Sequence, residues 1–477
     1  MTGLAQRILA IASTRPESAA LMEGSETVSY GQLRVLADEI GGMLAGTGPL
    51  AILAHKGSEA IAAVLDCLWQ DRPFLLVSPL LPASTRDRLL ADSGCTAILN
   101  PQSRNLELLA PDRQSIVPAG TGFMLTTSGS TGTPKIVLLD HPAVDRFAAW
   151  AGMAFGIGEG TPVLSLAPLN FDLSLLDIWA TLWHGGTVVL VPPAKAVDGA
   201  YVLKQLVDHR VEVAQGVPMF FQLVAGAGQD QGSGALRHLV LTGDETPQPT
   251  LTAMRRLFPA ATLHNVYGCT ETNDSLMHSV PPEVELPAQL LAGSPVAGAE
   301  VLLVDDAGRE VAGPGEGELL VRTPFQARGY LDSALTEGKF VQHPGRQGRF
   351  FRSGDLFRRD ADGGLKLLGR TDHQVKIRGV AVNTAEVERV LKLHANVDAA
   401  AVMTAPDPVG GRRLLAVVER KSGSAVSGLE LRNHCATHLP RTAVPSQLRV
   451  TDEALPLTTT GKINRLQAQR EHFPETV

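Results

Sequence analysis

The feature that most limits the fold of this chain is a regular alternation of short apolar segments with longer amphipathic ones between residues 51 and 267. The short segments are rich in Val, Leu and Ile, as is typical of strands buried on both faces. Strands are predicted at residues 51–55, 74–77, 96–100, 123–125, 136–139, 163–167, 187–191, 211–217, 236–242 and 262–267, and helices at residues 58–70, 84–93, 144–153, 173–183, 199–209, 219–225 and 247–257. This alternation predicts an α/β protein whose parallel sheets are covered by helices on both faces.

The flanking segments follow other patterns. Residues 1–45 predict helix, turn, helix, with Ser29 as the N-cap of the second helix. From about Leu291, three predicted strands and Gly/Pro-rich turns indicate a small antiparallel β unit. After residue 371 the pattern changes again to a small α+β domain. The strands of these two parts are predicted at residues 301–305, 318–321, 365–368, 374–378, 399–404, 413–420 and 447–451, and the helices at residues 384–393 and 428–438.

We therefore expect two domains, residues 1–371 and residues 372–477.

Composition excludes several other classes of protein. The net charge is −7 with acidic and basic residues well mixed, so no basic stripe indicates a nucleic-acid partner. No apolar run reaches about eighteen residues and the first residues lack a signal-peptide pattern, so no membrane association is expected. The four scattered cysteines fit buried free thiols in a reducing cytoplasm, which is the expected location.

A loop of Ser, Thr and Gly residues that ends in a lysine lies between two predicted strands, within Thr126–Lys135. Glycine lets backbone N–H groups point into one concavity, while the hydroxyls and the lysine add donors and positive charge, so the loop suits a polyphosphate. It is not a Walker loop, because no Gly-Lys-Ser/Thr follows the glycines. The alternative interpretation is a flexible linker. The candidate phosphate-binding residues are Thr127, Ser128, Gly129, Ser130, Thr131, Gly132 and Lys135.

Four further stretches carry polar groups at positions that suit a ligand. Asn265–Glu271 ends a predicted parallel strand, where α/β folds bind ligands. Phe351–Leu356 is predicted to place one carboxylate in a tight turn. Gly369–Gly379 crosses the domain boundary, and Pro456–Arg465 holds a lysine in a Gly/Thr loop.

In this order, these motifs resemble those of the acyl-adenylate-forming superfamily, which includes acyl-CoA synthetases, nonribosomal peptide adenylation domains and luciferases. The resemblance extends from Ser29 to Arg465 and is greatest for amino-acid adenylation domains. The segments that fit this subfamily are Phe171–Ser174, which is similar to its substrate-binding turn, Gly317–Leu319, Ala327–Leu331 and Leu439-Pro440. Three positions depart from the pattern: Ile136 replaces a usual Gly, Cys269 a usual Pro, and Asn383–Glu386 the usual Glu-Leu-Gly-Glu.

The resemblance implies an enzyme in which a carboxylate attacks the α-phosphorus of ATP and releases pyrophosphate, with catalysis by positioning and charge neutralisation. The phosphate loop would hold the β- and γ-phosphates, and Glu271 a Mg²⁺ ion. Tyr267 would stack on adenine, while Asp355 would bind the ribose hydroxyls with Arg370 beside it. Lys462 would contact the carboxylate and α-phosphate oxygens in the transition state. The residues implied around adenine and ribose are Gly243, Asp244, Glu245, Asn265, Tyr267, Gly268, Thr270, Asp355 and Arg370.

The resemblance also implies a substrate pocket in which Asp172 pairs with an α-ammonium group. The alternative role of Asp172 is an N-cap of the following helix. The other implied lining residues are Leu173, Leu176, Gln215, Val240, Thr242, Val266, Asp274 and Ser275. The leucines limit the pocket's size, and its polar members indicate a substrate with a polar or second basic group, with a proline-like substrate as the second possibility.

Members of the superfamily use two orientations of the small domain, so residues 372–477 are expected to move, with Asp372 at the hinge position. No Gly-Gly-x-Ser carrier motif occurs in the sequence, so a separate phosphopantetheinyl carrier protein is the expected acceptor. Two alternatives stay open. The first is an acyl-CoA or aryl-CoA synthetase with coenzyme A as acceptor, which Asp172 opposes, since a plain acyl chain needs no buried carboxylate. The second is a catalytically silent nucleotide-binding protein, which Lys462, Asp355 and Glu271 oppose.

Overall fold

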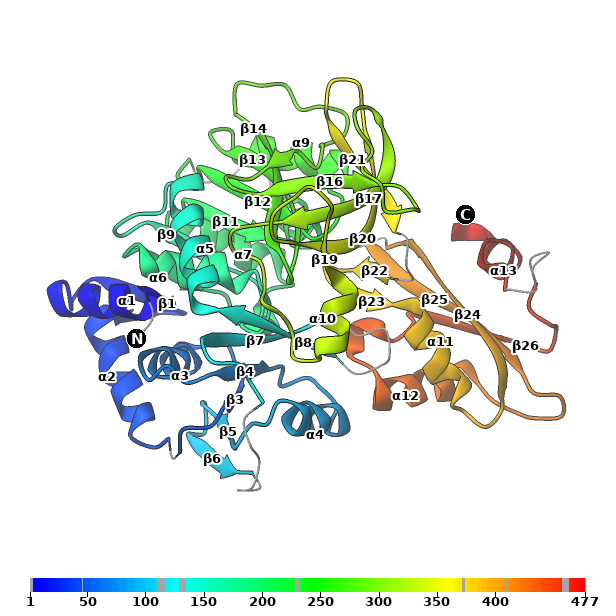
Figure 1. Cartoon of the computed structure of the whole chain (residues 1–477), viewed down its shortest axis with the longest axis horizontal. Helices are drawn as coiled ribbons and strands as arrows, with labels where there is room; N and C mark the ends of the chain where they lie inside the picture. Colours follow the sequence, from blue (N-terminus) through cyan, green and yellow to red (C-terminus); the bar gives the residue numbers. More distant parts are fainter. Residues whose placement is uncertain are drawn as a thin grey trace. The chain divides into compact units, whose positions relative to one another are not determined.

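The computed structural model describes residues 3–44, 46–109, 116–127, 134–227, 232, 234–370, 374–407, 411–456 and 463–476 (Figure 1). The chain divides into two compact units. The first comprises Met1–Pro79, Leu90–Thr127 and Lys135–Thr371, and the second comprises Leu80–Leu89, Ser128–Pro134 and Asp372–Val477.

The first sheet of the first unit runs in the order β15-β14-β13-β12-β11-β9-β10-β1-β2. Its central strands are parallel, and β2, β14 and β15 are antiparallel to their neighbours. The strands are β1 (Ala19–Glu23), β2 (Glu26–Ser29), β9 (Pro162–Ser165), β10 (Thr187–Leu190), β11 (Val213–Gly216), β12 (His238–Thr242), β13 (Thr262–Cys269), β14 (Asn273–Val280) and β15 (Ser294–Pro295). Helices α7 (Gly199–Asp208), α8 (Pro218–Ala227) and α9 (Gln248–Leu257) pack against one face of this sheet through a shared apolar cluster.

The second sheet runs in the order β18-β8-β7-β4-β3-β5-β6 and is parallel from β7 to β5. Its strands are β3 (Leu50–Leu53), β4 (Phe74–Val77), β5 (Ala97–Asn100), β6 (Asn105–Leu108), β7 (Thr121–Thr127), β8 (Lys135–Asp140) and β18 (Gly329–Tyr330). One large apolar cluster joins side chains of the first and second sheets with the intervening helices. These helices are α1 (Gly3–Thr14), α2 (Tyr30–Gly41), α3 (Ser58–Trp69), α5 (His141–Ala154), the π-helix η1 (Leu175–Ala180) and α6 (Thr181–Trp183), while α4 (Ala83–Asp92) connects β4 to β5.

A third, antiparallel sheet completes the first unit. It runs in the order β16-β17-β20-β19, with β21 paired to the other part of β20. Its apolar face includes Leu303, Leu319 and Phe357. The elements are β16 (Glu300–Val304), β17 (Gly315–Arg322), β19 (Phe340–Gln342), β20 (Arg349–Arg359), β21 (Leu365–Arg370) and helix α10 (Ser333–Lys339).

The second unit has its own core, in which Val387, Leu391, Val402 and Leu431 are buried. Both carboxylate oxygens of Glu388 accept hydrogen bonds from the Arg465 guanidinium, at 2.8 and 2.7 Å. These bonds join helix α11 (Thr384–Lys392) to the start of helix α13 (Arg465–His472). The elements are β22 (Gln374–Ile377), β23 (Val380–Asn383), α11 (Thr384–Lys392), β24 (Val397–Pro406), β25 (Arg412–Arg420), α12 (Gly428–His438), β26 (Gln447–Thr451) and α13 (Arg465–His472).

The α/β class, the large N-terminal sheets and the smaller C-terminal unit agree with the prediction from sequence. The Ser29 cap is also confirmed, because its side chain accepts from the Gln32 amide and the Gln32 side chain accepts from the Ser29 amide. Two details were wrong. The first 45 residues also contain the β1–β2 hairpin, since pairing with β10 overrides the helix propensity of Ala, Leu and Met. The edges of the predicted parallel sheets are antiparallel.

Three further expectations need correction. Asp355 lies within strand β20 and not in a tight turn, because both flanks of Gly354, whose φ is +73°, pair with neighbouring strands. The predicted helix at 173–183 begins as the π-helix η1. Cys269 is only partly buried, whereas the other three cysteines are buried.

Candidate active site

Several predicted pocket residues converge where three parallel strands end. Gln215 on β11 is paired in register with Val240 on β12, and Thr242 on β12 with Val266 on β13. Residues paired in register or two apart on one strand point to the same face, so these four side chains share one face of the sheet. All four are buried. The carboxyl ends of parallel strands are where open α/β sheets bind ligands.

Asp172 lies on the loop that follows β9. Its Oδ2 accepts a hydrogen bond of 2.7 Å from the Thr270 hydroxyl, in the turn after β13. The π-helix η1 begins three residues later, with Ser174 as its N-cap. Asp172 therefore lies two residues ahead of that cap and reaches the end of β13.

A second carboxylate faces Asp172. Asp274, at the start of β14, is 8% exposed, and burial together with the negative charge of Asp172 raises its pKa to about 7. Within the described residues, neither Oδ2 of Asp274 nor Oε1 of Gln215 has a hydrogen-bond partner. Two buried acceptors without partners are costly unless a ligand satisfies them.

The remaining residues predicted to line the pocket differ in their surroundings. Leu176 is fully buried within η1, and Leu173 is half-buried. The Ser275 hydroxyl is within hydrogen-bond distance of Thr272 and donates to the Asn273 carbonyl. Asn273 has a φ of +51° and its side chain donates to Phe325 O. Ser275 thus supports the turn from β13 to β14.

Tyr267, Asp355 and Arg370 form one hydrogen-bonded group. The Tyr267 hydroxyl donates to Asp355 Oδ2, and Arg370 Nη1 donates to Asp355 Oδ1, both at 2.5 Å. Asp355 and Arg370 are opposite each other in the β20–β21 register, and Arg370 Nη2 also donates to Ser353 O at 2.9 Å. Burial and the Asp355 carboxylate raise the pKa of Tyr267, so its hydroxyl stays protonated as a donor. The Tyr267 ring packs edge-on against Phe357.

The other predicted nucleotide residues lie on β13, in the turn after it, or in the loop that follows β12. Asn265 Nδ2 donates to the Leu291 carbonyl at 2.7 Å, so its amide fixes a neighbouring segment. Gly243 has a φ of +88°, which favours glycine, and the next residue, Asp244, accepts from the Glu245 amide. A Cβ on Gly268 would lie 2.1 Å from the backbone oxygen of Asn273, so only glycine fits at this position of β13.

The phosphate-loop prediction is described only at its two ends. Thr127 on β7 pairs in register with Lys135 on β8, which confirms the two predicted strands. Lys135 Nζ lies 5.4 Å from the centre of the Tyr330 ring, and the Tyr330 hydroxyl donates to Glu271 Oε1 at 2.6 Å. Burial and the Glu271 carboxylate raise the pKa of Tyr330, so it remains a donor. These contacts bring the predicted phosphate and metal residues together through one tyrosine.

Several predicted residues lie outside the described residues. They are Ser128, Gly129, Ser130, Thr131, Gly132, Asp372 and Lys462.

Glu271 suits a metal ion whose coordination shell is filled mainly by water and by a bound nucleotide. Among the described residues no group of three or more His, Cys, Asp or Glu side chains could hold a metal ion. Mg²⁺ usually takes one or two protein carboxylates and completes its shell with water and phosphate oxygens. A single buried carboxylate beside the phosphate-loop ends suits that arrangement.

Sequence reasoning missed the role of Tyr330. In the sequence, Ala327–Leu331 is only a segment that fits the subfamily. In the structure, its backbone amides donate hydrogen bonds to Glu271 O, Leu138 O and Ile136 O, and these bonds place Tyr330 beside β8. The register of β18 with β8 depends on pairing between residues distant in sequence, which a single sequence does not reveal. The only available signal was a tyrosine within a recognised motif.

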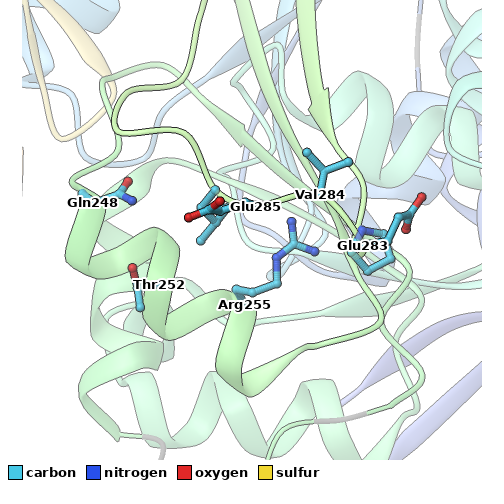
Figure 2. Close-up of a pocket in the computed structure, with 8 residues that line it drawn as sticks. Gln248, Thr252, Arg255, Glu283, Val284 and Glu285 are labelled. Atoms are coloured by element: carbon cyan, nitrogen blue, oxygen red, sulfur yellow. The ribbon is translucent and has the colours of Figure 1, made fainter.

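A surface hollow is lined by side chains of α9 and by residues 282–286 (Figure 2). Its Arg255 guanidinium donates to the carbonyls of Ala261, Val280 and Pro281. Arg255 therefore binds the chain's own backbone. Within the described part of the chain, no helix has the length and apolar character needed to cross a membrane.

Comparisons with known families agree with the resemblance found in the sequence. Residues 107–331 match the family described as AMP-binding enzyme, and residues 386–462 match the AMP-binding enzyme C-terminal domain. Together the two segments cover more than half of the chain.

Individual relatives cover nearly the whole chain. The chain is 28% identical to an L-proline--[L-prolyl-carrier protein] ligase of Pseudomonas fluorescens over 98% of this chain and 99% of that one. It is 29% identical to tyrocidine synthase 3 of Brevibacillus parabrevis over 94% of this chain, but spans only 7% of that protein. Among solved structures, it is similar to IdnL1 with a TM-score of 0.79 and 29% identity, covering 95% of this chain and 98% of that one.

Proposed function

Because the chain belongs to the AMP-binding enzyme family, we propose that it activates an amino acid as its aminoacyl-adenylate and then transfers it to the phosphopantetheine thiol of a carrier protein. In the first step, a carboxylate oxygen of the amino acid forms a bond to the α-phosphorus of ATP, and the bond from that phosphorus to pyrophosphate breaks. In the second step, the thiol sulfur attacks the carbonyl carbon, AMP leaves, and the thiol gives up its proton.

One observation carries the choice of an amino acid over a plain acid: the half-buried Asp172 carboxylate is held by Thr270 at the end of β13, and its charge acts on the buried Asp274. Burial of a carboxylate costs free energy, and a substrate ammonium offsets that cost. The hydrogen bond from Thr270 orients the Asp172 carboxylate, and a bound ammonium would favour the ionised form of Asp274, whose pKa is otherwise raised to about 7. A plain acyl chain offers no positive charge to either carboxylate, which argues against a CoA synthetase.

We propose that the substrate side chain carries a hydrogen-bond donor, such as an amino or hydroxyl group. The unpartnered acceptors of Asp274 and Gln215 support this, because each would gain a bond on substrate binding. Proline is the second candidate. It is favoured by the similarity of the chain to the Pseudomonas fluorescens relative, which is an L-proline--[L-prolyl-carrier protein] ligase.

The nucleotide would be held by the group around Asp355. Its carboxylate would accept from the ribose hydroxyls, with Arg370 and Tyr267 fixing its position, and the Tyr267 ring would lie against adenine. Lys135 and the phosphate-loop residues Thr127–Gly132 would neutralise the β- and γ-phosphates. Mg²⁺, when held by Glu271 and the phosphates, would add further charge neutralisation.

Residues 1–371 would bind ATP and the amino acid, and residues 372–477 would act as a mobile domain. Lys462 would contact the reacting oxygens during adenylation, and Asp372 would act as the hinge between the two half-reactions. Coenzyme A is the alternative acceptor, and the cytoplasm is the proposed location.

Pyrophosphate exchange tests the proposal. The protein would be screened with amino acids that carry amino or hydroxyl side chains, with proline and with the des-amino acid of each. Exchange that depends on the α-amino group supports amino-acid activation, whereas exchange with plain acids alone would favour the CoA-synthetase alternative. An exchange-active substrate would then be offered a phosphopantetheinyl carrier or coenzyme A, and mass spectrometry of the thioester identifies the acceptor.

A further inference from the structure

The second unit carries a positive charge, although the chain as a whole is acidic. Residues 372–477 contain 14 Lys and Arg against 11 Asp and Glu, a formal charge of +3, whereas the whole chain carries −7. A local excess of one sign attracts partners of the opposite sign and speeds their association. The place where the positive side chains gather therefore indicates where an acidic partner would bind.

Three arginines gather at one end of the β24–β25 hairpin. We call Arg378, Arg412 and Arg413 the arginine corner. Arg412 and Arg413 begin β25 and pair in register with the last two residues of β24. Arg378, in the turn between β22 and β23, joins them through Asp407, which directly follows β24, because Arg378 Nη2 lies 3.2 Å from Asp407 Oδ2. Among these residues, one carboxylate accompanies three guanidinium groups, so the corner keeps an excess of positive charge.

The other end of the same sheet is acidic. The start of β24, the end of β25 and the end of β26 lie there, as their register shows. Four carboxylates occur at this end against two cations; they are Asp398, Glu419, Asp452 and Glu453, against Arg420 and Lys421. Within this sheet, positive charge is therefore concentrated at the arginine corner.

The corner arginines keep hydrogen-bonding capacity that the chain itself does not need. Arg378 and Gly379 have φ values of +51° and +80°, and the first position of such a two-residue turn favours Asn, Asp or Gly, so an arginine there is unfavourable for the backbone. Its side chain is 51% exposed. Arg412 is exposed and donates to a neutral acceptor, the Thr404 hydroxyl, at 2.7 Å. Arg413 Nε is buried and has no hydrogen-bond partner among the described residues, which is costly unless a partner supplies an acceptor.

We propose that the arginine corner is the docking surface for an acidic face of the carrier protein that accepts the aminoacyl group. This inference rests on the proposed function. A guanidinium group binds a carboxylate through two parallel N–H bonds, so Asp and Glu side chains of the carrier match the corner. The three groups come from two hairpins, and this spread suits several carboxylates of a protein face better than a single phosphate.

The test neutralises two corner residues that have no printed ion pair to lose. R412Q/R413Q removes two charges, and R412K/R413K keeps both charges but loses the planar fork. The matched control is K421Q/R432Q, which removes two charges from exposed side chains of the same unit. The probe is an acidic phosphopantetheinyl carrier protein that the parent enzyme loads, used in its holo form for loading and in its apo form, without phosphopantetheine, for binding.

KM for the holo carrier should rise by about tenfold or more in R412Q/R413Q and change by less than about threefold in R412K/R413K and in K421Q/R432Q. Pyrophosphate exchange, which needs no carrier, should change by less than about threefold in all variants. The parent's KM for the carrier should increase between about 50 and about 300 mM NaCl more steeply than that of R412Q/R413Q, because salt screens the lost attraction. Calorimetry with the apo carrier should show the same tenfold loss, because the contact is made by the carrier's protein surface.

An unchanged KM for the carrier in R412Q/R413Q would overturn the docking surface, and so would equal losses in the glutamine and lysine variants, which would indicate packing and not charge. Apo-carrier binding that is equal in the parent and R412Q/R413Q, with a loss for the holo form alone, would assign the corner to the phosphate of phosphopantetheine and overturn a protein contact. A parent enzyme that loads no carrier at all would instead refute the proposed acceptor, which separates the two failures.

Discussion

Replacing Asp172 by alanine tests the proposed amino-group contact. The substitution would leave a substrate ammonium without its partner in a mostly buried pocket. Truncating one side of a buried charge pair costs roughly 2–5 kcal/mol. At about 1.4 kcal/mol per factor of ten, kcat/KM for the amino acid should fall by at least about 30-fold.

The neighbouring carboxylate modifies this loss in a way that depends on pH. The Asp172 charge helps to raise the pKa of Asp274 to about 7, so its removal lowers that pKa and leaves Asp274 more fully ionised near neutral pH. Asp274 should then partly replace the lost charge. The residual activity of D172A should increase from pH 6 to pH 8 relative to that of the parent, and D172A/D274N should lose this recovery.

The assay is pyrophosphate exchange with one amino acid and its des-amino acid, measured for the parent, D172A, D172A/D274N and the exposed control D208N. The des-amino acid should be affected little by D172A, because it has no ammonium to lose a partner. A similar loss on both compounds would refute the reasoning and make Asp172 a structural residue of its loop.

Three other substitutions probe separate parts of the site. Tyr330→Phe removes the hydroxyl that donates to Glu271, and a hydrogen bond to a charged acceptor is worth about 1.5–3 kcal/mol. In steady-state kinetics, KM for MgATP should therefore rise about tenfold while KM for the amino acid is unchanged. The reverse pattern would contradict a role near the phosphates. Lys462→Ala should slow adenylation by at least about 10²-fold, measured by exchange, while ATP binding and thioester formation from pre-made adenylate persist; equal loss of both half-reactions would exclude two domain orientations. Asp274→Asn should stabilise the protein more at pH 8 than at pH 4, as measured by denaturant titrations at the two pH values. The gain in the free energy of unfolding should be up to about 1.4 kcal/mol per pH unit between the unfolded pKa near 4 and the folded pKa near 7. A pH-independent difference would show that Asp274 is not protonated in the folded state.

The sign of the Asp274 effect follows from its raised pKa. Between pH 4 and pH 7 the folded protein holds a proton that the unfolded chain has released, so stability falls as the pH rises through this window. Asparagine cannot ionise and therefore removes this loss.

The sequence allowed the α/β architecture and most helices and strands to be predicted, because the period of apolar residues reports directly on buried strands and amphipathic helices. Errors occurred where long-range pairing decides the structure. Residues 19–23 have helix-forming composition, yet they form β1, which pairs with β10. Ser353-Gly354-Asp355 has turn composition, yet β17 and β21 hold it as a strand.

The site was predicted mainly through resemblance, and its residue roles remain predictions. The structure adds contacts that no local pattern contains. The Tyr330–Glu271 hydrogen bond joins residues 59 positions apart, and Lys56 contacts Ser165 across 109 positions. Such contacts depend on how the sheets pack, and a lone lysine or tyrosine in the sequence gives no sign of them.

The central claim is that an amino acid is joined through its carboxylate to AMP, and isotope transfer tests it most directly. The exchange-active amino acid would be prepared with ¹⁸O in its carboxylate and converted to product with ATP and the thiol acceptor. The account predicts that the AMP released carries one ¹⁸O atom, because its bridging oxygen comes from the carboxylate. Label found in inorganic phosphate with ADP as the nucleotide product, or AMP without label, would contradict it.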